Sequence, residues 1–127
     1  MARPRGKKTG IYKSQLEARF AADFKLEYEP DSFKYEIPAT MHSYTPDWKI
    51  SETCYIETKG FLGAKDRQKL LYIKEQHPKV IVALVFQKDL KLGERLGTCL
   101  SWAKKHGFPA FLETDKSAIS LFIKLNK

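Results

Sequence analysis

The stretch TPDWKISETCYIETKG, residues 45–60, decides the fold of this 127-residue chain. Its two halves, 47–50 and 53–59, are rich in aromatic and β-branched side chains, which favour extended backbone. Between them lies the short polar pair Ser51-Glu52, and two strands joined by so short a turn pair antiparallel. The stretch therefore predicts a β-hairpin.

A helix is predicted ahead of this hairpin. The run Ser14-Gln15-Leu16-Glu17 matches a capping box, in which the serine accepts a hydrogen bond from the backbone and the glutamate reaches back. Phe20 and Phe24 then follow Leu16 at helical spacing and form an apolar stripe. The helix should therefore begin just after Ser14.

Further elements are predicted on both sides of the hairpin. Residues 33–37 form a strand, and the polar stretch 39–45, which has a proline just before it and another just after it, is extended. The uninterrupted apolar run 80–86 is typical of a central strand covered on both faces. The other predictions are a helix at 66–77, a basic loop at 87–97, a helix at 100–106 that stops at Gly107, an edge strand at 108–112, and a segment at 118–125 that fits both periods and favours a helix.

Together these elements predict one α/β domain over residues 14–127, with a mixed sheet flanked by helices. A chain of this length buries one hydrophobic core rather than two. Residues 1–13 combine basic side chains with Pro4, Gly6 and Gly10 and have few apolar groups, so they predict a flexible arm.

Basic residues outnumber acidic ones, with 23 lysines and arginines against 15 aspartates and glutamates and a net charge of +8. This excess favours a polyanionic partner, because basic side chains neutralise phosphates and release counterions. Charge alone does not separate an enzyme from a binding protein. The predicted DNA-binding residues lie in the arm and in the loop at 87–97: Arg3, Arg5, Lys7, Lys8, Lys13, Lys88, Lys91 and Arg95.

The candidate catalytic residues lie in the predicted hairpin. Glu57 and Lys59 are two apart on one strand and therefore point to the same face. Antiparallel pairing brings Asp47 toward Glu57, so that two carboxylates and a lysine meet. A lone Glu-x-Lys pair is common on strand surfaces, but its combination with Pro46-Asp47, an apolar strand frame and a basic chain favours a nuclease site.

Two close carboxylates repel each other unless a cation lies between them. Hard oxygen ligands select Mg²⁺, which pairs naturally with phosphate substrates, and Mn²⁺ is expected to substitute. Such a cation polarises the phosphoryl group and acidifies a bound water, while Lys59 orients that water or stabilises charge in the transition state. The residues thus predict Mg²⁺-dependent phosphodiester hydrolysis.

Glu17 is a further candidate for the site. Its simplest role is in the capping box, but the same carboxylate on the first helix could also approach a second metal ion. The acidic residues Glu27, Glu29, Asp31 and Glu36 have no basic partner at the required offset and are predicted to be solvated.

The two cysteines, Cys54 and Cys99, match no paired zinc spacing and are too few for a disulfide framework. We therefore expect reduced thiols in a cytoplasmic protein. The longest apolar run, 80–86, is far shorter than a membrane span, so no membrane partner is expected.

Five motifs occur in an order that resembles the phage endonuclease I family of Holliday-junction resolvases, within the PD-(D/E)xK nuclease superfamily. They are Ser14-Gln15-Leu16-Glu17, Tyr35-x-Ile37-Pro38-Ala39, His42-Ser43-Tyr44-Thr45-Pro46-Asp47, Glu57-Thr58-Lys59-Gly60, and Asp66-Arg67 through Glu75-Gln76-His77-Pro78. The resemblance covers residues 14–86 well and extends weakly to residues 104–107. The chain departs from the family pattern in a shorter connection after the first helix and a shorter C-terminal region.

This resemblance implies a restriction-endonuclease-like core and a Mg²⁺-dependent nuclease that cuts branched double-stranded DNA, including the four-way junctions of DNA recombination. It implies an intertwined, domain-swapped homodimer, located in the host cell cytoplasm if the chain is phage-encoded. It makes Asp47, Glu57 and the Thr58 carbonyl metal ligands, Lys59 the catalytic base or stabiliser, and Glu17 the second-site carboxylate. In such a dimer, Glu17 of one chain is expected to complete the site of the other.

Two other functions agree with the same residues. Another nuclease of this core could nick DNA or cleave transposon ends, because the same core serves several substrates. A basic nucleic-acid-binding module could carry the Glu-Lys pair without catalysis. Cleavage assays on different DNA structures separate these alternatives.

Overall fold

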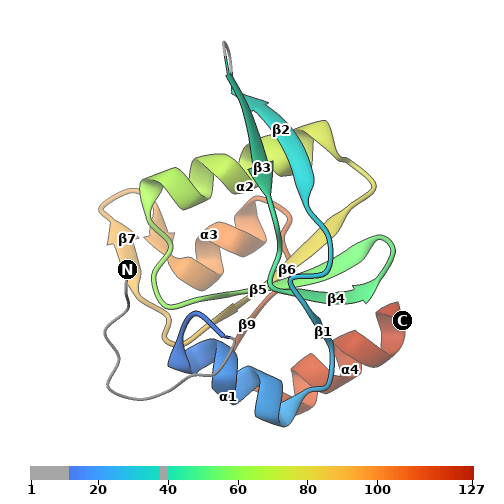
Figure 1. Cartoon of the computed structure of the whole chain (residues 1–127). Helices are drawn as coiled ribbons and strands as arrows, with labels where there is room; N and C mark the ends of the chain where they lie inside the picture. The colour runs from blue at the N-terminus through green and yellow to red at the C-terminus, as the bar shows by residue number, and fades with distance from the viewer. Residues whose placement is uncertain (1–11, 38–39) are drawn as a thin grey trace.

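A five-stranded mixed sheet forms the centre of the computed structural model, which describes residues 12–37 and 40–127 (Figure 1). The spatial order is β1-β4-β5-β6-β9; β1, β4 and β5 pair antiparallel, whereas β5, β6 and β9 pair parallel. The strands are β1 (Glu27–Tyr28), β4 (Trp48–Ser51), β5 (Cys54–Lys59), β6 (Ile81–Phe86) and β9 (Ala110–Leu112). The predicted mixed sheet is therefore confirmed.

Helices cover both faces of this sheet and make three layers (Figure 1). Helices α1 (Gln15–Asp23) and α4 (Lys116–Asn126) cover one face, where Phe20 and Ile119 are buried. Helices α2 (Ala64–Gln76) and α3 (Cys99–Lys105) cover the other. All four lie where the sequence predicts helices, including 118–125, whose period was ambiguous.

Strand β6 runs through the middle of both cores. Val82, Leu84 and Phe86 are buried on the α2 and α3 side, while Ala83 and Val85 are buried on the α1 and α4 side. Every residue after the first is buried, which explains the lack of alternation in its sequence. The prediction of a strand covered on both faces is confirmed.

The β4–β5 hairpin carries Asp47 at its start and Lys59 at its end. Its turn lies one residue later than predicted, at Glu52 and Thr53, because Ser51 pairs with Cys54. A register shift after Lys49 places the extra residue in β4 rather than in the turn. The strand pairing that the sequence predicts is otherwise present.

The predicted cap of α1 is present in a modified form. The Ser14 side chain accepts a hydrogen bond from the Glu17 backbone N–H at 3.1 Å, as predicted. The Glu17 side chain reaches back to the backbone N–H of Lys13, at 3.0 Å, rather than to that of Ser14. The same carboxylate oxygen also accepts a hydrogen bond from the hydroxyl of Tyr28, so the Glu17 side chain lies between the start of α1 and residue 28.

The segment between α1 and β4 contains a strand that the sequence analysis missed. Glu27–Tyr28 forms β1, an edge strand that pairs with β4. The predicted strand and extended stretch form a separate hairpin of β2 (Phe33–Ile37) and β3 (Thr40–Tyr44). This hairpin projects beyond the main sheet in Figure 1 and packs against α2.

The region 87–97 is not entirely a loop. It contains a short hairpin of β7 (Lys91–Gly93) and β8 (Gly97–Thr98). Gly93 and Gly97 have φ values of 151° and 75°, which allow the tight turn between the strands. The predicted helix stop at Gly107 is confirmed by its φ of 83°.

Two further observations concern the described residues. Cys54 and Cys99 are both buried and free. Within residues 12–37 and 40–127, each helix is too short or too polar to cross a membrane.

Candidate active site at the end of strand β5

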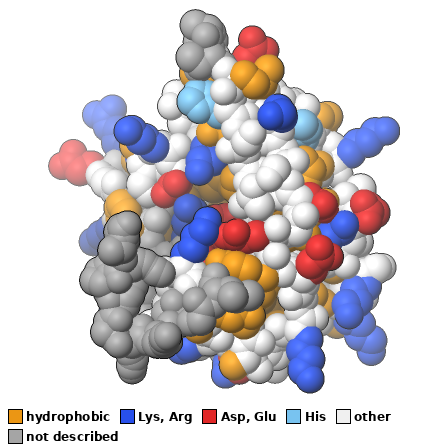
Figure 2. Space-filling view, in the orientation of Figure 1, with side chains coloured by type: hydrophobic (Ala, Val, Ile, Leu, Met, Phe, Trp, Pro, Cys, Tyr) orange, Lys and Arg blue, Asp and Glu red, His pale blue; other side chains and the backbone are white. Residues whose placement is uncertain are grey.

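Four buried polar side chains gather where β4 begins and β5 ends: Glu17, Asp47, Glu57 and Thr58. Charged residues are rarely buried this deeply unless they are paired or bind a cation. Figure 2 shows basic and acidic side chains next to one another near the centre of this face. The structure thus brings the sequence-predicted residues to one end of the sheet.

Asp47 is held across the hairpin by Thr58. Its Oδ2 accepts hydrogen bonds from the Thr58 backbone N–H at 2.9 Å and from the Thr58 hydroxyl at 2.8 Å. Both of these hydrogen bonds are made to the same oxygen of the carboxylate. Burial, followed by the charges of Glu57 and Glu17, raises the pKa of Asp47 from 3.8 to about 8, and the Thr58 hydrogen bonds oppose this rise only in part.

Glu57 and Lys59 share a face, as predicted. The Lys59 Nζ lies 3.5 Å from the Glu57 Oε2 and 3.2 Å from the Asp66 Oδ1. Burial raises the pKa of Glu57, and Lys59 and the Tyr44 hydroxyl only partly oppose this effect. Burial would lower the pKa of Lys59, but the charges of Glu57 and Asp66 outweigh it and raise that pKa, which keeps the ammonium charged.

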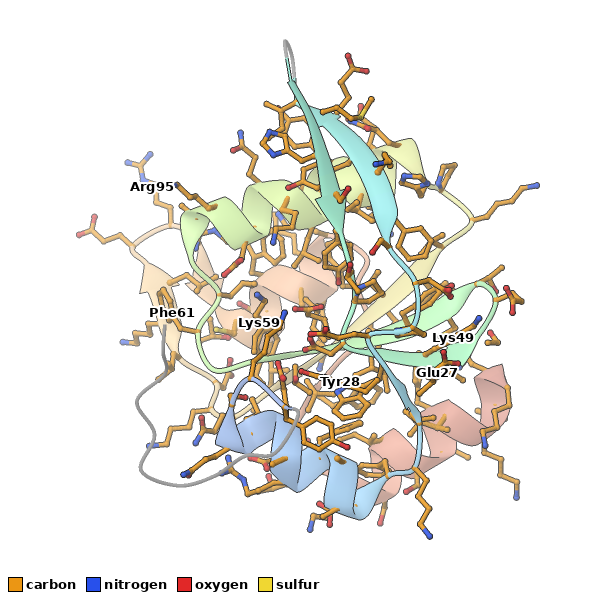
Figure 3. The ribbon with its side chains drawn as sticks, in the orientation of Figure 1. Glu27, Tyr28, Lys49, Lys59, Phe61 and Arg95 are labelled. Atoms are coloured by element: carbon orange, nitrogen blue, oxygen red, sulfur yellow. The ribbon has the colours of Figure 1, made fainter. Side chains whose placement is uncertain are left out.

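Glu17 is anchored beside the site by Tyr28. The Tyr28 hydroxyl donates a hydrogen bond of 2.6 Å to the same Glu17 oxygen that accepts from the Lys13 backbone. Glu17 raises the pKa of Asp47 of its own chain, which shows that the two carboxylates are electrostatic neighbours. Burial and the Glu17 carboxylate both raise the pKa of Tyr28, so its hydroxyl stays a donor. Figure 3 shows the Tyr28 and Lys59 side chains in the region between β1 and the end of β5.

Three side chains of the site were not identified from the sequence as functional. Tyr44 donates a hydrogen bond to the Glu57 Oε1 at 2.8 Å, Asp66 pairs with Lys59, and Tyr28 holds Glu17. Tyr44 and Asp66 lie inside the motifs quoted for the family resemblance, and that is the signal that could have identified them. Tyr28 lies on the strand that was missed.

A cavity of about 400 Å³ opens beside these residues, between the first turn of α1 and the end of β5. Glu17 and Lys59 of the site line one part of this cavity. The lining residues are Ser14, Gln15, Leu16, Glu17, Arg19, Thr58, Lys59, Gly60 and Gln87. A ligand that enters this cavity therefore meets the candidate catalytic lysine.

The donor chemistry of the site fits a hard divalent cation. Asp47 and Glu57 supply buried carboxylates, whose pKa values are raised mainly by burial, and carboxylate oxygens are ligands that hard divalent cations prefer. Within residues 12–37 and 40–127, however, no three His, Cys, Asp or Glu side chains are grouped as a metal site. Glu17 is thus near the acidic pair but is held by Tyr28 rather than grouped with it as a ligand.

The predicted DNA-binding residues fall into three groups. Arg3, Arg5, Lys7 and Lys8 lie outside the described residues. Lys13 is described, and it forms an ion pair of 2.9 Å with Glu29. Lys88, Lys91 and Arg95 are exposed in and around the β7–β8 hairpin.

The acidic residues assigned to a solvated connection differ in their surroundings. Glu27 and Glu36 are exposed, as predicted. Glu29 pairs with Lys13, and Asp31 forms an ion pair of 3.0 Å with Lys49, so these two have specific partners. None of them joins the acidic pair of the site.

The fold and the site define a class of three-layered α/β proteins that carry an acidic pair and a lysine at the end of two antiparallel strands. The chain belongs to the phage endonuclease I family, whose profile matches residues 1–117.

Two curated relatives are similar to this chain. Endonuclease I of Escherichia phage T7 is 39% identical over 88 residues, which cover 65% of this chain and 59% of the relative. Endodeoxyribonuclease 1 of Enterobacteria phage T3 is 40% identical over 95 residues, which cover 73% of this chain and 60% of the relative. The matched region thus spans about three fifths of the length of each relative.

Proposed function

We propose that this chain is a divalent-cation-dependent deoxyribonuclease that hydrolyses phosphodiester bonds in branched DNA, including four-way junctions. The observation that carries the proposal is the buried pair Asp47 and Glu57 beside the charged Lys59. The membership of the phage endonuclease I family and the names of the T7 and T3 relatives support a DNA substrate. The basic composition supports it as well.

Asp47, Glu57 and the carbonyl of Thr58 would hold Mg²⁺, or Mn²⁺ in its place, and Glu17 would serve a second ion. The bound ion supplies Lewis-acid chemistry, which draws electron density from the phosphate and acidifies the attacking water. Thr58 fixes the Asp47 carboxylate through two hydrogen bonds, so the site is pre-organised before substrate binds.

Lys59 acts on the substrate in this proposal. Its ammonium orients the attacking water or stabilises the negative charge that develops on the phosphate. Glu57 and Asp66 hold that ammonium in position from two sides. Tyr44 in turn fixes the Glu57 carboxylate, so a chain of contacts aligns the lysine.

We further propose a restriction-endonuclease-like core in an intertwined homodimer, because paired cuts in a two-fold symmetric junction need two sites. In the single chain, α1 packs on its own sheet and Glu17 lies beside its own Asp47. An exchange of the segment before β4 would place Glu17 of one chain at the same position in the other. Refolding Glu17→Ala chains with Asp47→Ala chains tests this: a shared site restores nicking, and self-contained sites stay inactive.

The function itself is tested by cleavage of matched DNA structures. Four-way junction, nicked, mismatched and linear duplex DNA are incubated with protein and Mg²⁺, Ca²⁺ or excess chelator. We expect cutting of the junction with Mg²⁺ only, and its loss in Asp47→Asn, Glu57→Gln and Lys59→Ala. Equal cutting of linear duplex would favour a nuclease of another specificity. Wild-type activity in all three variants would favour a binding module with a contaminating nuclease.

A further inference from the structure

The loop that follows the site carries an aromatic side chain in an unusual position. Phe61 comes two residues after Lys59 and is 52% exposed, whereas the adjacent Leu62 is completely buried. Phe61 belongs to neither hydrophobic core cluster of the described residues. About half of its side-chain surface is therefore open to a ligand.

The backbone around Phe61 is fixed on both sides. Before it, the Lys59 carbonyl accepts a hydrogen bond from the backbone of Gln87 at 3.2 Å. After it, the Leu62 carbonyl accepts a hydrogen bond from the Arg67 guanidinium at 2.8 Å. An exposed ring on a fixed backbone needs little ordering when it binds a ligand.

Phe61 also lies next to the place where substrate would bind. Lys59 and Gly60, which precede it, line the cavity of about 400 Å³ next to Glu17, and Phe61 follows directly after this lining. Figure 3 shows Phe61 on the other side of Lys59 from Tyr28, in the direction of Arg95. A DNA strand with a phosphate at Lys59 would bring the adjacent bases close to this ring.

We propose that Phe61 forms a stacking site for a nucleobase next to the cleaved phosphodiester bond, and this inference rests on the proposed deoxyribonuclease function. Every nucleobase has a π face, so an aromatic ring binds it without regard to sequence. A base at a branch point has lost part of its stacking and costs less to expose than a base within a duplex. The site therefore favours branched over linear DNA.

Binding measured in Ca²⁺, where cleavage is suppressed, tests the proposal. We expect Phe61→Ala to weaken binding of a four-way junction about tenfold and to leave binding of linear duplex within a factor of two. Phe61→Leu, which keeps an apolar group but has no π face, should show the same loss. Phe61→Tyr should keep wild-type affinity. Leu121→Ala is the matched control, because Leu121 is 56% exposed on α4.

A direct spectroscopic readout uses Phe61→Trp. A tryptophan that stacks on a base loses fluorescence, so titration with junction DNA should quench this variant more than the wild type, whose Trp48 and Trp102 are buried. Equal quenching, or wild-type junction affinity in Phe61→Ala, would overturn the inference. So would a change of oligomeric state in Phe61→Ala, because the ring would then belong to a protein interface. Failure of the wild type itself to cut or bind junction DNA would refute the proposed function instead.

Discussion

Strands β5 and β6 lie side by side in the same sheet and pair residue by residue, yet their second halves have opposite chemistry. Glu57 pairs with Leu84, and Lys59 pairs with Phe86. Leu84 and Phe86 are fully buried and pack on the α2 and α3 side, and Val85 between them is buried on the α1 and α4 side. On β5, Glu57 is buried and Lys59 is half-buried, and these two residues carry charges that face one another.

The difference separates stability from chemistry within one sheet. Burial of apolar side chains on β6 stabilises the fold by about 1.5–3 kcal/mol per residue. Burial of like charges at Asp47 and Glu57 works against it, as their raised pKa values indicate. The end of β5 therefore carries buried charges that oppose stability, while the neighbouring strand supplies it.

The largest effect is expected from a substitution that removes one charge of the acidic pair. Glu57→Gln should lower junction cleavage roughly 100- to 1,000-fold, because the site loses a charged group that is pre-organised for the transition state. The free energy of unfolding should stay the same or increase, since repulsion with Asp47 is relieved and Tyr44 keeps an acceptor. The measurements are single-turnover cleavage rates and chemical denaturation.

Glu52→Gln is the matched control for this variant. Glu52 lies in the turn of the same hairpin and is exposed. It should retain wild-type activity and stability. A loss of stability in Glu57→Gln comparable to that of a core variant would contradict the contrast between β5 and β6.

The opposite result is expected at the paired position on β6. Leu84→Ala should lower the free energy of unfolding by about 2–5 kcal/mol, because Leu84 is completely buried and leaves a cavity. Below the unfolding temperature, the remaining folded protein should cut junctions at close to the wild-type rate. Denaturation by urea measures the first quantity, and a decrease under about 1 kcal/mol would show that β6 is not the stabilising strand.

The acidic pair also predicts a pH dependence in the presence of a chelator. The pKa of Asp47 is raised from 3.8 to about 8 in the folded protein. The folded state thus holds a proton that the unfolded chain releases, and stability falls as the pH rises between these two values. The slope for one proton is at most about 1.4 kcal/mol per pH unit.

Thermal denaturation between about pH 5 and about pH 8 checks this dependence. Asp47→Asn should flatten the curve, whereas Asp89→Asn, at an exposed position, should leave it unchanged. Addition of Mg²⁺ should restore stability at the higher pH. A metal-free wild type whose stability rises over this range would contradict the electrostatic account of the site.

A smaller effect is expected at the edge of the site. Tyr28→Phe keeps the ring, whose centroid lies 4.9 Å from that of the Trp48 ring. It removes only the hydroxyl that holds Glu17. Cleavage at low Mg²⁺ should fall about tenfold, with a higher Mg²⁺ concentration needed for half-maximal rate and little change in unfolding. Tyr72→Phe, on α2, is the control. An unchanged Mg²⁺ requirement would show that Glu17 needs no positioning by Tyr28.

Most of the features that distinguish β5 from β6 could be predicted from the sequence, because the signals for them are local. Unbroken hydrophobicity identified β6, and the two-residue spacing of Glu57 and Lys59 placed them on one face. The antiparallel turn brought Asp47 near them, although the turn itself lies one residue later. These features depend on neighbours in the chain.

What the sequence did not reveal depends on tertiary contacts. Strand β1 has only two residues, too few for any periodic signal, and it exists because β4 offers an open edge. The β7–β8 hairpin depends on two glycines with positive φ rather than on alternation. The roles of Tyr28 and Tyr44 arise from side chains that meet residues 11 and 13 positions away, respectively.

The smallest expected effect concerns a part of the molecule outside both strands, the exposed β7–β8 hairpin. Lys91 and Arg95 there are predicted to bind DNA phosphates, which adds affinity without sequence information. Their joint replacement by alanine should weaken junction and duplex binding alike. It should also reduce the slope of log affinity against log salt by about 0.9 for each phosphate that the variant no longer neutralises. Replacement of Lys124 and Lys127 removes the same charge from the C-terminal end of the chain, which lies across the molecule from β7 in Figure 1, and should leave the slope unchanged. Equal slopes in the two double variants would mean that the hairpin acts only through net charge. The cleavage rate of bound DNA should be unaffected in both double variants, because neither pair of residues touches the acidic site.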